Sequence, residues 1–454
     1  MRMIFVVMNA LAHREHWGSR IGFIFATMGS AVGLGNIWRF PTVVVRNGGG
    51  AFVLLYLLII LAIGVPTMIA ELVLGKKTQR NVVSAFDQIK PGSRWGLVGL
   101  LSMAASFLVL SFYAVIAGWT AIYLLGSLSG HLVTGDASAL TVLFSRVSSH
   151  GILSVTGQAA FLLLTVIVVV AGVTGGIERV NSVLMPGIVV ILTVLLIRTL
   201  LLPGAIPGVL WFLRPDVSRL SLKVALDALG QVFFSFSLGM GAIVTYGSYL
   251  PRDHDIPGSA LWVAGSDLAV ALLAGLTVIP ALFAFGIPPE GGPGLIFVTL
   301  PAIFSTLPFS VIWASLFFTM LLFAALSSSV SMLEVVVSYF VDVHRFTRVK
   351  AACVSGIAVF LLGIPSALST GRLSGFLILG RTFFDFVDFI ASSVFLPVAG
   401  FFTAVFVAWT WGVDQALAEL RVGQRSALGE AWAFAIKYLV PASVMYVFVR
   451  GLLE

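Results

Sequence analysis

Charged side chains are scarce in this sequence. Its 454 residues include 26 Lys and Arg and 19 Asp and Glu, so that only 10% of the chain is charged, whereas soluble proteins carry about a quarter. Hydrophobic residues make up 59% of the chain, which is more than a single soluble core can bury. These proportions exclude a soluble enzyme and predict a polytopic helical membrane protein.

Cysteine is almost absent as well. Cys353 is the only thiol in the sequence, which excludes an internal disulfide and a cluster of thiolate ligands. The net charge of +7 comes from basic residues scattered between apolar blocks, so we expect no nucleic-acid partner. The apolar blocks contain no nucleophile paired with a base, so we expect that the protein is not an enzyme.

Long apolar blocks are what the sequence has in abundance. Blocks of spanning length predict an all-α membrane protein with about eleven transmembrane helices. Their approximate positions are residues 20–45, 50–75, 95–126, 155–174, 179–203, 224–250, 257–286, 308–342, 350–370, 376–412 and 431–452. With the N-terminus in the cytoplasm, Lys and Arg are in excess on the inner side, so we expect this orientation in the lipid bilayer.

Two of these predicted spans, the first and the sixth, are interrupted by small and polar residues. The interruptions are GSAVGLGN at residues 29–36 and SFSLGMG at residues 235–241. Close helix packing through small residues would explain one such segment. Two of them in corresponding places indicate an inverted-repeat transporter, because irregular backbone at membrane depth is tolerated where it lines a cavity.

Several motifs resemble those of the neurotransmitter:sodium symporter family. They are REHW at 14–17, GSAVGLGN at 29–36, WRFP at 38–41, NGGGAF at 47–52, QVFFSFSLGMGA at 231–242, TYGSY at 245–249, TLPAIF at 299–304 and AALSSS at 324–329. The resemblance covers residues 13–450, nearly the whole chain. It implies the LeuT-like fold of the bacterial amino-acid symporter branch, with an inverted five-plus-five helix repeat, broken first and sixth helices and, in the eleven-helix subgroup, one trailing helix.

The resemblance also implies where the parts of the chain begin and end. Residues 1–16 are expected as a cytoplasmic N-terminal segment, 17–203 as the first five-helix repeat, 204–223 as a connecting loop, 224–412 as the second inverted repeat, and 413–454 as a cytoplasmic loop with the eleventh helix. The activity implied is sodium-coupled import of neutral hydrophobic amino acids by alternating access in a prokaryotic inner (plasma) membrane. The alternatives are another small zwitterion as substrate, or a non-transporting amino-acid-binding sensor. We expect no organic cofactor, and the oligomeric state stays open.

An amino acid at the bilayer centre brings two charges, and each needs a partner because an unpaired charge there is costly. Free backbone N–H and carbonyl groups at the two helix breaks can supply these partners. By resemblance, the substrate-binding residues are Ala31, Gly33, Leu34, Gly35, Val109, Tyr113, Phe234, Ser235, Ser237, Met240, Ser331 and Met332. The side-chain pocket among them contains no acid or base, which favours a hydrophobic substrate. Monoamine transporters of the family have an aspartate where Gly33 stands, so an amine without a carboxylate is not expected.

Two sodium sites follow from the resemblance, and both are built from the oxygen atoms that sodium prefers. The site that touches the substrate is expected at Ala31, Asn36, Ser235 and Asp267. The second site is expected at Gly29, Val32, Ala324, Ser327 and Ser328.

Asp267 departs from the family pattern. Family members usually have asparagine at this position and, one turn later, a glutamate in many bacterial proteins or a serine in chloride-dependent ones. The later residue here is Ala271. Because residues i and i+4 share one helix face, Asp267 places a negative charge on the same face, one turn away from that position. We therefore expect transport without chloride, with Tyr56, Gln231 and Ser235 lining the space without holding an anion.

Alternating access needs contacts that close one end of the protein at a time. By resemblance, the outer gate is Arg39 with Asp388, and the inner gate is Arg14 with Asp342, helped by Trp17 and Tyr249. Exposed ion pairs contribute about 0 to 1 kcal/mol, which suits contacts that must open in every cycle. Glu71 and Glu178 lie at the ends of spans, and we expect structural roles for them.

Overall fold

The computed structural model describes residues 15–131, 137–287, 294–421 and 426–453, and the predicted gate residue Arg14 lies outside them. Within the described residues, regular structure is helical except for the short hairpin of β1 (Leu377–Ile378) and β2 (Arg381–Thr382). Nine helical segments of the described chain are long and apolar enough to cross a membrane. A tenth candidate span is bent by 53° between residues 31 and 35.

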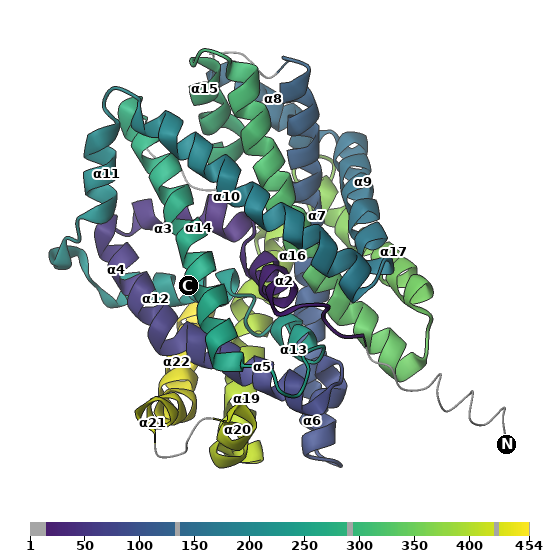
Figure 1. Ribbon diagram of the computed structural model, residues 1–454. Coiled ribbons are helices and arrows are strands. Elements are labelled where there is room, and N and C mark those ends of the chain that lie inside the picture. The colour runs from purple at the N-terminus through teal and green to yellow at the C-terminus, as the bar shows by residue number, and fades with distance from the viewer. Residues whose placement is uncertain (1–14, 132–136, 288–293, 422–425, 454) are drawn as a thin grey trace.

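The predicted first repeat begins with the bent span and includes the long helices α7, α9 and α10 (Figure 1). Its elements are α2 (Arg20–Ala31), η1 (Gly35–Arg39), α3 (Phe40–Arg46), α4 (Gly50–Ile59), η2 (Ile60–Gly64), α5 (Val65–Thr78), α6 (Val82–Ile89), α7 (Gly96–Leu128), α8 (Ala137–Ser149), α9 (Gly151–Val170), η3 (Val173–Glu178) and α10 (Arg179–Leu200). The bent span is α2 followed by η1 and α3.

The predicted second repeat begins with the other broken span. Its elements are α12 (Leu222–Ser235), α13 (Ala242–Gly247), α14 (Ile256–Ala284), η5 (Leu295–Thr299), α15 (Leu300–Ser305), α16 (Ser310–His344), α17 (Arg348–Leu368), the β-hairpin, α18 (Phe383–Asp388), η6 (Phe389–Phe395), α19 (Leu396–Val405) and η7 (Phe406–Gly412). The same helical segment continues through α20 (Val413–Leu420), which lies where a loop was expected. The trailing span consists of α21 (Ala427–Phe434), η8 (Ala435–Leu439) and α22 (Val440–Leu453). With the sixth span divided into α12 and α13, these segments account for the predicted eleven.

The connecting segment 204–223 is more ordered than the expected loop. It contains α11 (Ala205–Leu213) and the short η4 (Val217–Arg219). Ala205, Gly208 and Phe212 of α11 are buried, and this spacing places them on one face of the helix. The helix packs on α14, where a Cβ at Gly208 would lie 2.7 Å from the Cα of Pro280. Burial of this apolar face explains why the segment is helical.

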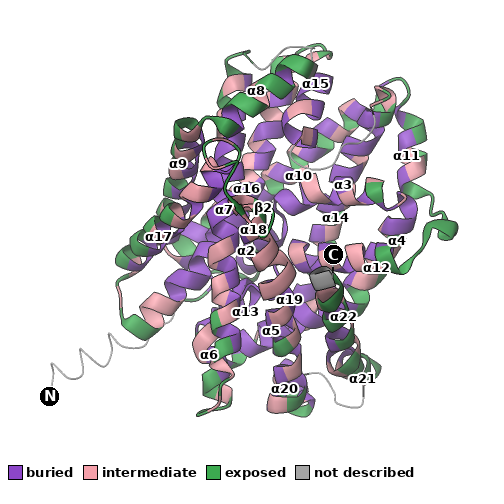
Figure 2. Cartoon of the chain, turned by 180° about the vertical axis from the view of Figure 1, so that it is seen from behind, coloured by how far each residue is buried: buried purple, intermediate pink, exposed green. Residues whose placement is uncertain are grey.

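The core of the bundle surrounds the first broken span. α2 packs against α10, α14 and α16, and it lies near the centre of the molecule in Figure 1. Figure 2 shows buried residues concentrated in this interior and exposed residues on outer helices such as α9, α11 and α17. Exposed side chains on α9 and α10 include Leu163, Ile167 and Ile197, as expected for surfaces that face lipid rather than water.

The backbone of the second break explains why a helix cannot continue through it. Ser237, Gly239 and Gly241 have φ angles of 52°, 75° and 76°. This left-handed region costs glycine little and is unusual for other residues. The glycines of the SFSLGMG motif thus permit the chain to turn between α12 and α13, and they leave backbone groups free to bind other partners.

Candidate functional site

The two helix breaks lie against each other in the interior. Ser237 Oγ donates a hydrogen bond to the carbonyl oxygen of Ser30 at 2.8 Å. Ser30 Oγ donates in turn to Ser331 Oγ on α16 at 2.9 Å. Gln231 Nε2 donates to the carbonyl oxygen of Gly35 at 3.1 Å. Three segments far apart in the sequence are therefore joined by hydrogen bonds, two of which end on carbonyl oxygens of the first break.

Glycine is required in the first break because side chains approach its backbone closely. A Cβ at Gly33 would lie 2.6 Å from Ser328 Oγ and 3.2 Å from Tyr113 Oη, and a Cβ at Gly35 would lie 2.9 Å from an aromatic ring. The N–H of Leu34 donates to Tyr113 Oη at 3.3 Å. A larger residue at position 33 therefore has no room, and Tyr113 faces the N–H groups of the break.

The twelve residues expected to bind substrate fall into two groups. Leu34, Gly35, Tyr113 and Phe234 line a cavity of about 560 Å³. The other eight are buried and lie outside the cavity lining: Ala31, Gly33, Val109, Ser235, Ser237, Met240, Ser331 and Met332. The cavity thus ends at the first break, next to the remaining predicted residues.

Asp267 on α14 is fully buried and contacts both breaks. Ser235 Oγ donates to its Oδ2 at 2.9 Å, and Asn36 Nδ2 donates to its Oδ1 at 2.8 Å. Asn36 Nδ2 also lies 3.1 Å from Ser235 Oγ, and Asn36 Oδ1 accepts from the N–H of Gly33 at 3.2 Å. Three of the four residues expected at the first sodium site are in direct contact, while the fourth, Ala31, ends α2. Carboxylate, hydroxyl and amide oxygens are suitable ligands for a hard cation.

The five residues expected at the second sodium site are also adjacent. Ser328 Oγ lies 3.3 Å from the carbonyl oxygen of Gly29 and 3.4 Å from that of Val32. Ser327 Oγ lies 3.4 Å from the same Val32 oxygen and donates to the carbonyl of Ala324 at 2.9 Å. Two hydroxyls and three carbonyl oxygens from α2, Val32 at its C-terminal end, and α16 therefore converge here, and all of them are neutral.

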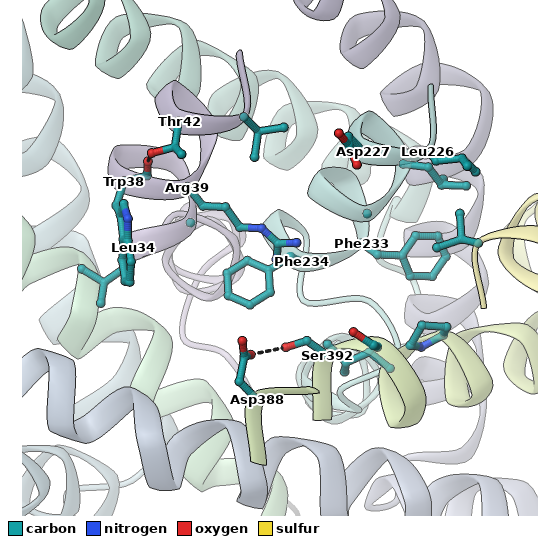
Figure 3. Close-up of a pocket in the computed structure, with 18 of the residues that line it drawn as sticks. Leu34, Trp38, Arg39, Thr42, Leu226, Asp227, Phe233, Phe234, Asp388 and Ser392 are labelled. Atoms are coloured by element: carbon teal, nitrogen blue, oxygen red, sulfur yellow. Dashed lines mark hydrogen bonds between the residues drawn. The ribbon is translucent and has the colours of Figure 1, made fainter. Parts of the chain in front are cut away.

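The predicted outer gate is not closed in this structure. We call the end that carries Arg39 and Asp388 outer and the end that carries Trp17 inner, following the orientation expected from the sequence. Both gate residues line the cavity. The guanidinium of Arg39 lies over the ring of Phe234, 4.6 Å from its centroid, and Asp388 accepts from Ser392 Oγ at 2.7 Å. Figure 3 shows Arg39 and Asp388 on opposite walls, and these two described residues form no ion pair with each other.

The inner end is closed by several contacts of Trp17. Its indole Nε1 donates to the carbonyl oxygen of Tyr246 at 3.0 Å, and its backbone N–H donates to the carbonyl oxygen of Tyr249 at 3.3 Å. Its ring packs edge-on against both tyrosine rings. Asp342 accepts from the backbone N–H and the Nδ2 of Asn81, at 2.9 and 3.0 Å. The predicted inner residues other than Arg14 thus tie α13 and α16 to neighbouring segments.

A buried charge network at the inner end is absent from the sequence-based prediction. Tyr249 Oη donates to Glu334 Oε1 at 2.6 Å, and Arg348 pairs with Glu334 and, at 3.1 Å, with Glu15. The side chain of Glu334 has no exposed surface, and that of Arg348 is 17% exposed. The rule that identified Asp267, an acid within an apolar span, also applies to Glu334.

Glu71 and Glu178 contact the broken spans directly. Glu71 Oε1 accepts from the N–H of Gly239 at 2.8 Å, and its residue is 1% exposed. Glu178 accepts from the N–H of Gly18 at 2.7 Å and from Ser19 Oγ at 2.9 Å. Asp267 is therefore one of three buried carboxylates, with Glu71 and Glu334, that contact the broken spans or their inner ends.

Comparison with known proteins gives consistent matches over nearly the full chain. A profile described as the Sodium:neurotransmitter symporter family matches residues 14–142 and 137–454. A sodium-dependent transporter of Bacillus subtilis (strain 168) is 40% identical over 436 residues, which is 96% of this chain and 97% of that protein. The sodium- and chloride-dependent creatine transporter 1 of Homo sapiens is 28% identical over 97% of this chain and 77% of its own length.

A solved structure with the same fold is that of MhsT in complex with L-phenylalanine. It matches with a TM-score of 0.90 and 46% sequence identity, over 97% of this chain and 100% of that chain. This match confirms the predicted LeuT-like all-helical fold. The family consists of secondary transporters and not of enzymes. The chain is a sodium-dependent membrane transporter and belongs to the sodium:neurotransmitter symporter family.

Proposed function

We propose that this protein is a sodium-coupled symporter that imports neutral hydrophobic amino acids by alternating access. Its membrane is the inner (plasma) membrane of a prokaryote, with the N-terminus in the cytoplasm. The observation that carries the proposal is the meeting of two helix breaks beside the buried carboxylate of Asp267. Unpaired backbone groups, a carboxylate and hydroxyls in one buried place suit a zwitterion together with a cation.

The substrate would lie where the cavity reaches the first break. Its carboxylate would accept from Tyr113 Oη and from N–H groups near Gly33 and Gly35, and its ammonium would donate to carbonyl oxygens of the breaks. Its side chain would lie among Val109, Phe234, Ser237, Met240, Ser331 and Met332, which include no acid or base. The relative MhsT was crystallised with L-phenylalanine, which agrees with a pocket for hydrophobic side chains.

Two sodium ions would accompany the substrate. The first would bind next to the substrate at Ala31, Asn36, Ser235 and Asp267, and the second at Gly29, Val32, Ala324, Ser327 and Ser328. Asp267 supplies the only formal negative charge in these two sets. Neutral oxygens supply the other ligands, which suits a cation that must be released in every cycle.

Transport without chloride follows from the position of Asp267. Its carboxylate is held by Asn36 and Ser235, so a fixed negative charge already stands beside the first sodium site. Ala271, one turn later on α14, is fully buried and has no group that binds an anion. Tyr56 and Gln231 then line this region without a bound chloride.

The experiment that tests the proposal is uptake of labelled phenylalanine and other hydrophobic amino acids into proteoliposomes containing the purified protein. An inward sodium gradient should drive accumulation, and an equal potassium gradient should not. Replacing chloride by gluconate should leave the rate unchanged. Uptake without sodium stimulation for every hydrophobic amino acid would disprove the proposed coupling, and a sharp fall in gluconate would disprove chloride independence.

Variants of α14 test the role of the carboxylate. Asp267→Asn should reduce sodium-driven uptake by at least about tenfold, because the fixed charge next to the ion is lost. Adding Ala271→Glu to Asp267→Asn should restore part of the uptake, because it returns the charge to the same helix face one turn away. Ala271→Ser in the native background is the matched control, since it leaves Asp267 in place and should keep uptake independent of chloride.

A further inference from the structure

Asn181 on α10 has a side-chain oxygen without a hydrogen-bond partner in the interior. The residue has no exposed surface. Its Nδ2 donates to the carbonyl oxygen of Ile177 at 2.9 Å, which fixes the direction of the amide. Its Oδ1 accepts no hydrogen bond from any described residue. A buried acceptor left without a donor is costly, and this amide oxygen is therefore available to a ligand.

The unpartnered oxygen points at a residue of the second sodium site. An ideal Cβ at Gly29 would lie 2.0 Å from Asn181 Oδ1 and 3.1 Å from Ser327 Cβ. Asn181 and Ser327 therefore approach the same side of Gly29, whose carbonyl oxygen lies 3.3 Å from Ser328 Oγ. Asn181 Oδ1 thus lies against the backbone that supplies two of the predicted sodium ligands.

Asn181 lies on the inner side of this site. It follows Glu178 by three residues, and Glu178 holds the N-terminus of α2 through Gly18 and Ser19. Gly22, near the start of α2, also lies against Glu178, because a Cβ added at Gly22 would clash with the Glu178 carboxylate. Gly29 lies seven residues further along, near the other end of α2. Along α2, Glu178 of η3 therefore contacts the inner end, and Asn181 of α10 contacts the part next to the second sodium site.

We propose that Asn181 Oδ1 is an additional sodium ligand, which receives the ion from the second site when it leaves toward the inner end of the protein. This inference rests on the proposed second sodium site. A sodium ion that leaves the five neutral oxygens of the second site loses these ligands before water can replace them. An amide oxygen beside its path supplies a replacement ligand during this step. The free Oδ1 is the group of α10 that satisfies this requirement, and glycine at position 29 allows its close approach.

Sodium binding and release by the purified full-length protein test the proposal. Asn181→Asp keeps the shape of the side chain and adds a charge, and it should lower the half-saturating sodium concentration by about fivefold or more. Asn181→Ala removes the oxygen, and it should leave this concentration within about twofold while slowing release of bound radioactive sodium by about fivefold. Ser182→Asp is the matched control: it adds the same charge on the exposed side of α10 and should change neither quantity.

Sodium binding by the native protein separates the two proposals. If the native protein binds no sodium, the proposed function itself is wrong. If it binds sodium and both Asn181 variants behave like it, the additional ligand alone is wrong. A packing role predicts that Asp, with the shape of Asn, keeps native sodium binding, and this result in a folded Asn181→Asp protein would overturn the proposal. Should Asn181→Asp fail to fold, a native release rate in Asn181→Ala would overturn it instead.

Discussion

The two ends of the molecule are built differently. At the inner end, Trp17 contacts Tyr246 on α13, and Tyr249 contacts Glu334 on α16, which pairs with Arg348. At the outer end, a cavity of about 560 Å³ separates Arg39 from Asp388, and the described residues include no ion pair between them (Figure 3). The central site is therefore closed on the inner side and reached from the outer side.

Under the proposed alternating access, this difference indicates which contacts must change during a transport cycle. To open, the inner end has to break a buried hydrogen-bonded network and expose its polar groups to water. To close, the outer end has to bring together two charged groups that already face the same cavity. Breaking a buried pair by removing one partner costs about 3 to 5 kcal/mol. An exposed pair contributes about 0 to 1 kcal/mol, and the half-buried Arg39 and Asp388 do not form their pair in this structure. We therefore expect substitutions at the inner end to have the larger effects.

Chemical labelling should show the largest contrast between the two ends. Ser393 lines the outer cavity, whereas Ser338 is 3% exposed and lies on α16 between Glu334 and Asp342. In a Cys353→Ser background, Ser393→Cys should react with a water-soluble thiol reagent at least about tenfold faster than Ser338→Cys in the purified protein without substrate. Equal rates at the two positions would contradict the described asymmetry.

Removing the cation of the inner network should have the next largest effect. Arg348→Ala leaves the fully buried carboxylate of Glu334 with Tyr249 as its partner, so sodium-driven uptake should fall by about tenfold or more. When Arg348→Ala is added to the Cys353→Ser, Ser338→Cys protein, the cysteine at position 338 should react faster with the thiol reagent. Lys350→Ala is the matched control, because Lys350 is an exposed cation two residues away. Native uptake in Arg348→Ala would show that the network is not needed for closure.

Substitution at the outer end should have a moderate effect. Asp388→Asn should reduce uptake by about threefold to tenfold and leave equilibrium substrate binding within about twofold, because the proposed outer pair would form on closure and is not formed in this structure. Asp385→Asn, on the same short helix but exposed, should not change uptake. A loss of uptake in both variants would point to the stability of α18 rather than to the gate.

An exposed ion pair at the inner end should have the smallest effect. Arg20 and Asp255 are 3.3 Å apart, with side chains 52% and 55% exposed. Arg20→Ala should change uptake by less than about twofold, because solvent screens such a pair. An effect as large as that of Arg348→Ala would remove the distinction between buried and exposed contacts on which the comparison depends.

Much of the site was predictable because its residues are conspicuous in an apolar sequence. Glycine clusters and a carboxylate inside spanning segments identified both breaks and Asp267, and the structure places Asn36, Ser235 and Asp267 in contact. The helix α11 in the connecting segment was missed because its apolar stretch is too short to span a membrane, and its stability comes from packing on α14.

Contacts between distant segments were harder to predict. Glu334 and Arg348 lie on two consecutive helices, and the sequence does not show that their side chains turn toward each other. Asn181 resembles any polar residue near the end of a span, and its importance depends on Gly29, which is distant in the sequence. Pairing of this kind is set by the three-dimensional packing of helices and not by local composition.

The buried carboxylates also constrain how the chain is assembled. Glu334 and Arg348 are separated by 14 residues, so they enter the membrane almost together during synthesis, and Asp267 follows its partners Asn36 and Ser235. Glu71 is different, because it accepts a hydrogen bond from the N–H of Gly239, which lies 168 residues further along the chain. During synthesis, Glu71 on α5 therefore lacks this hydrogen-bond donor until the segment that connects α12 and α13 has been made.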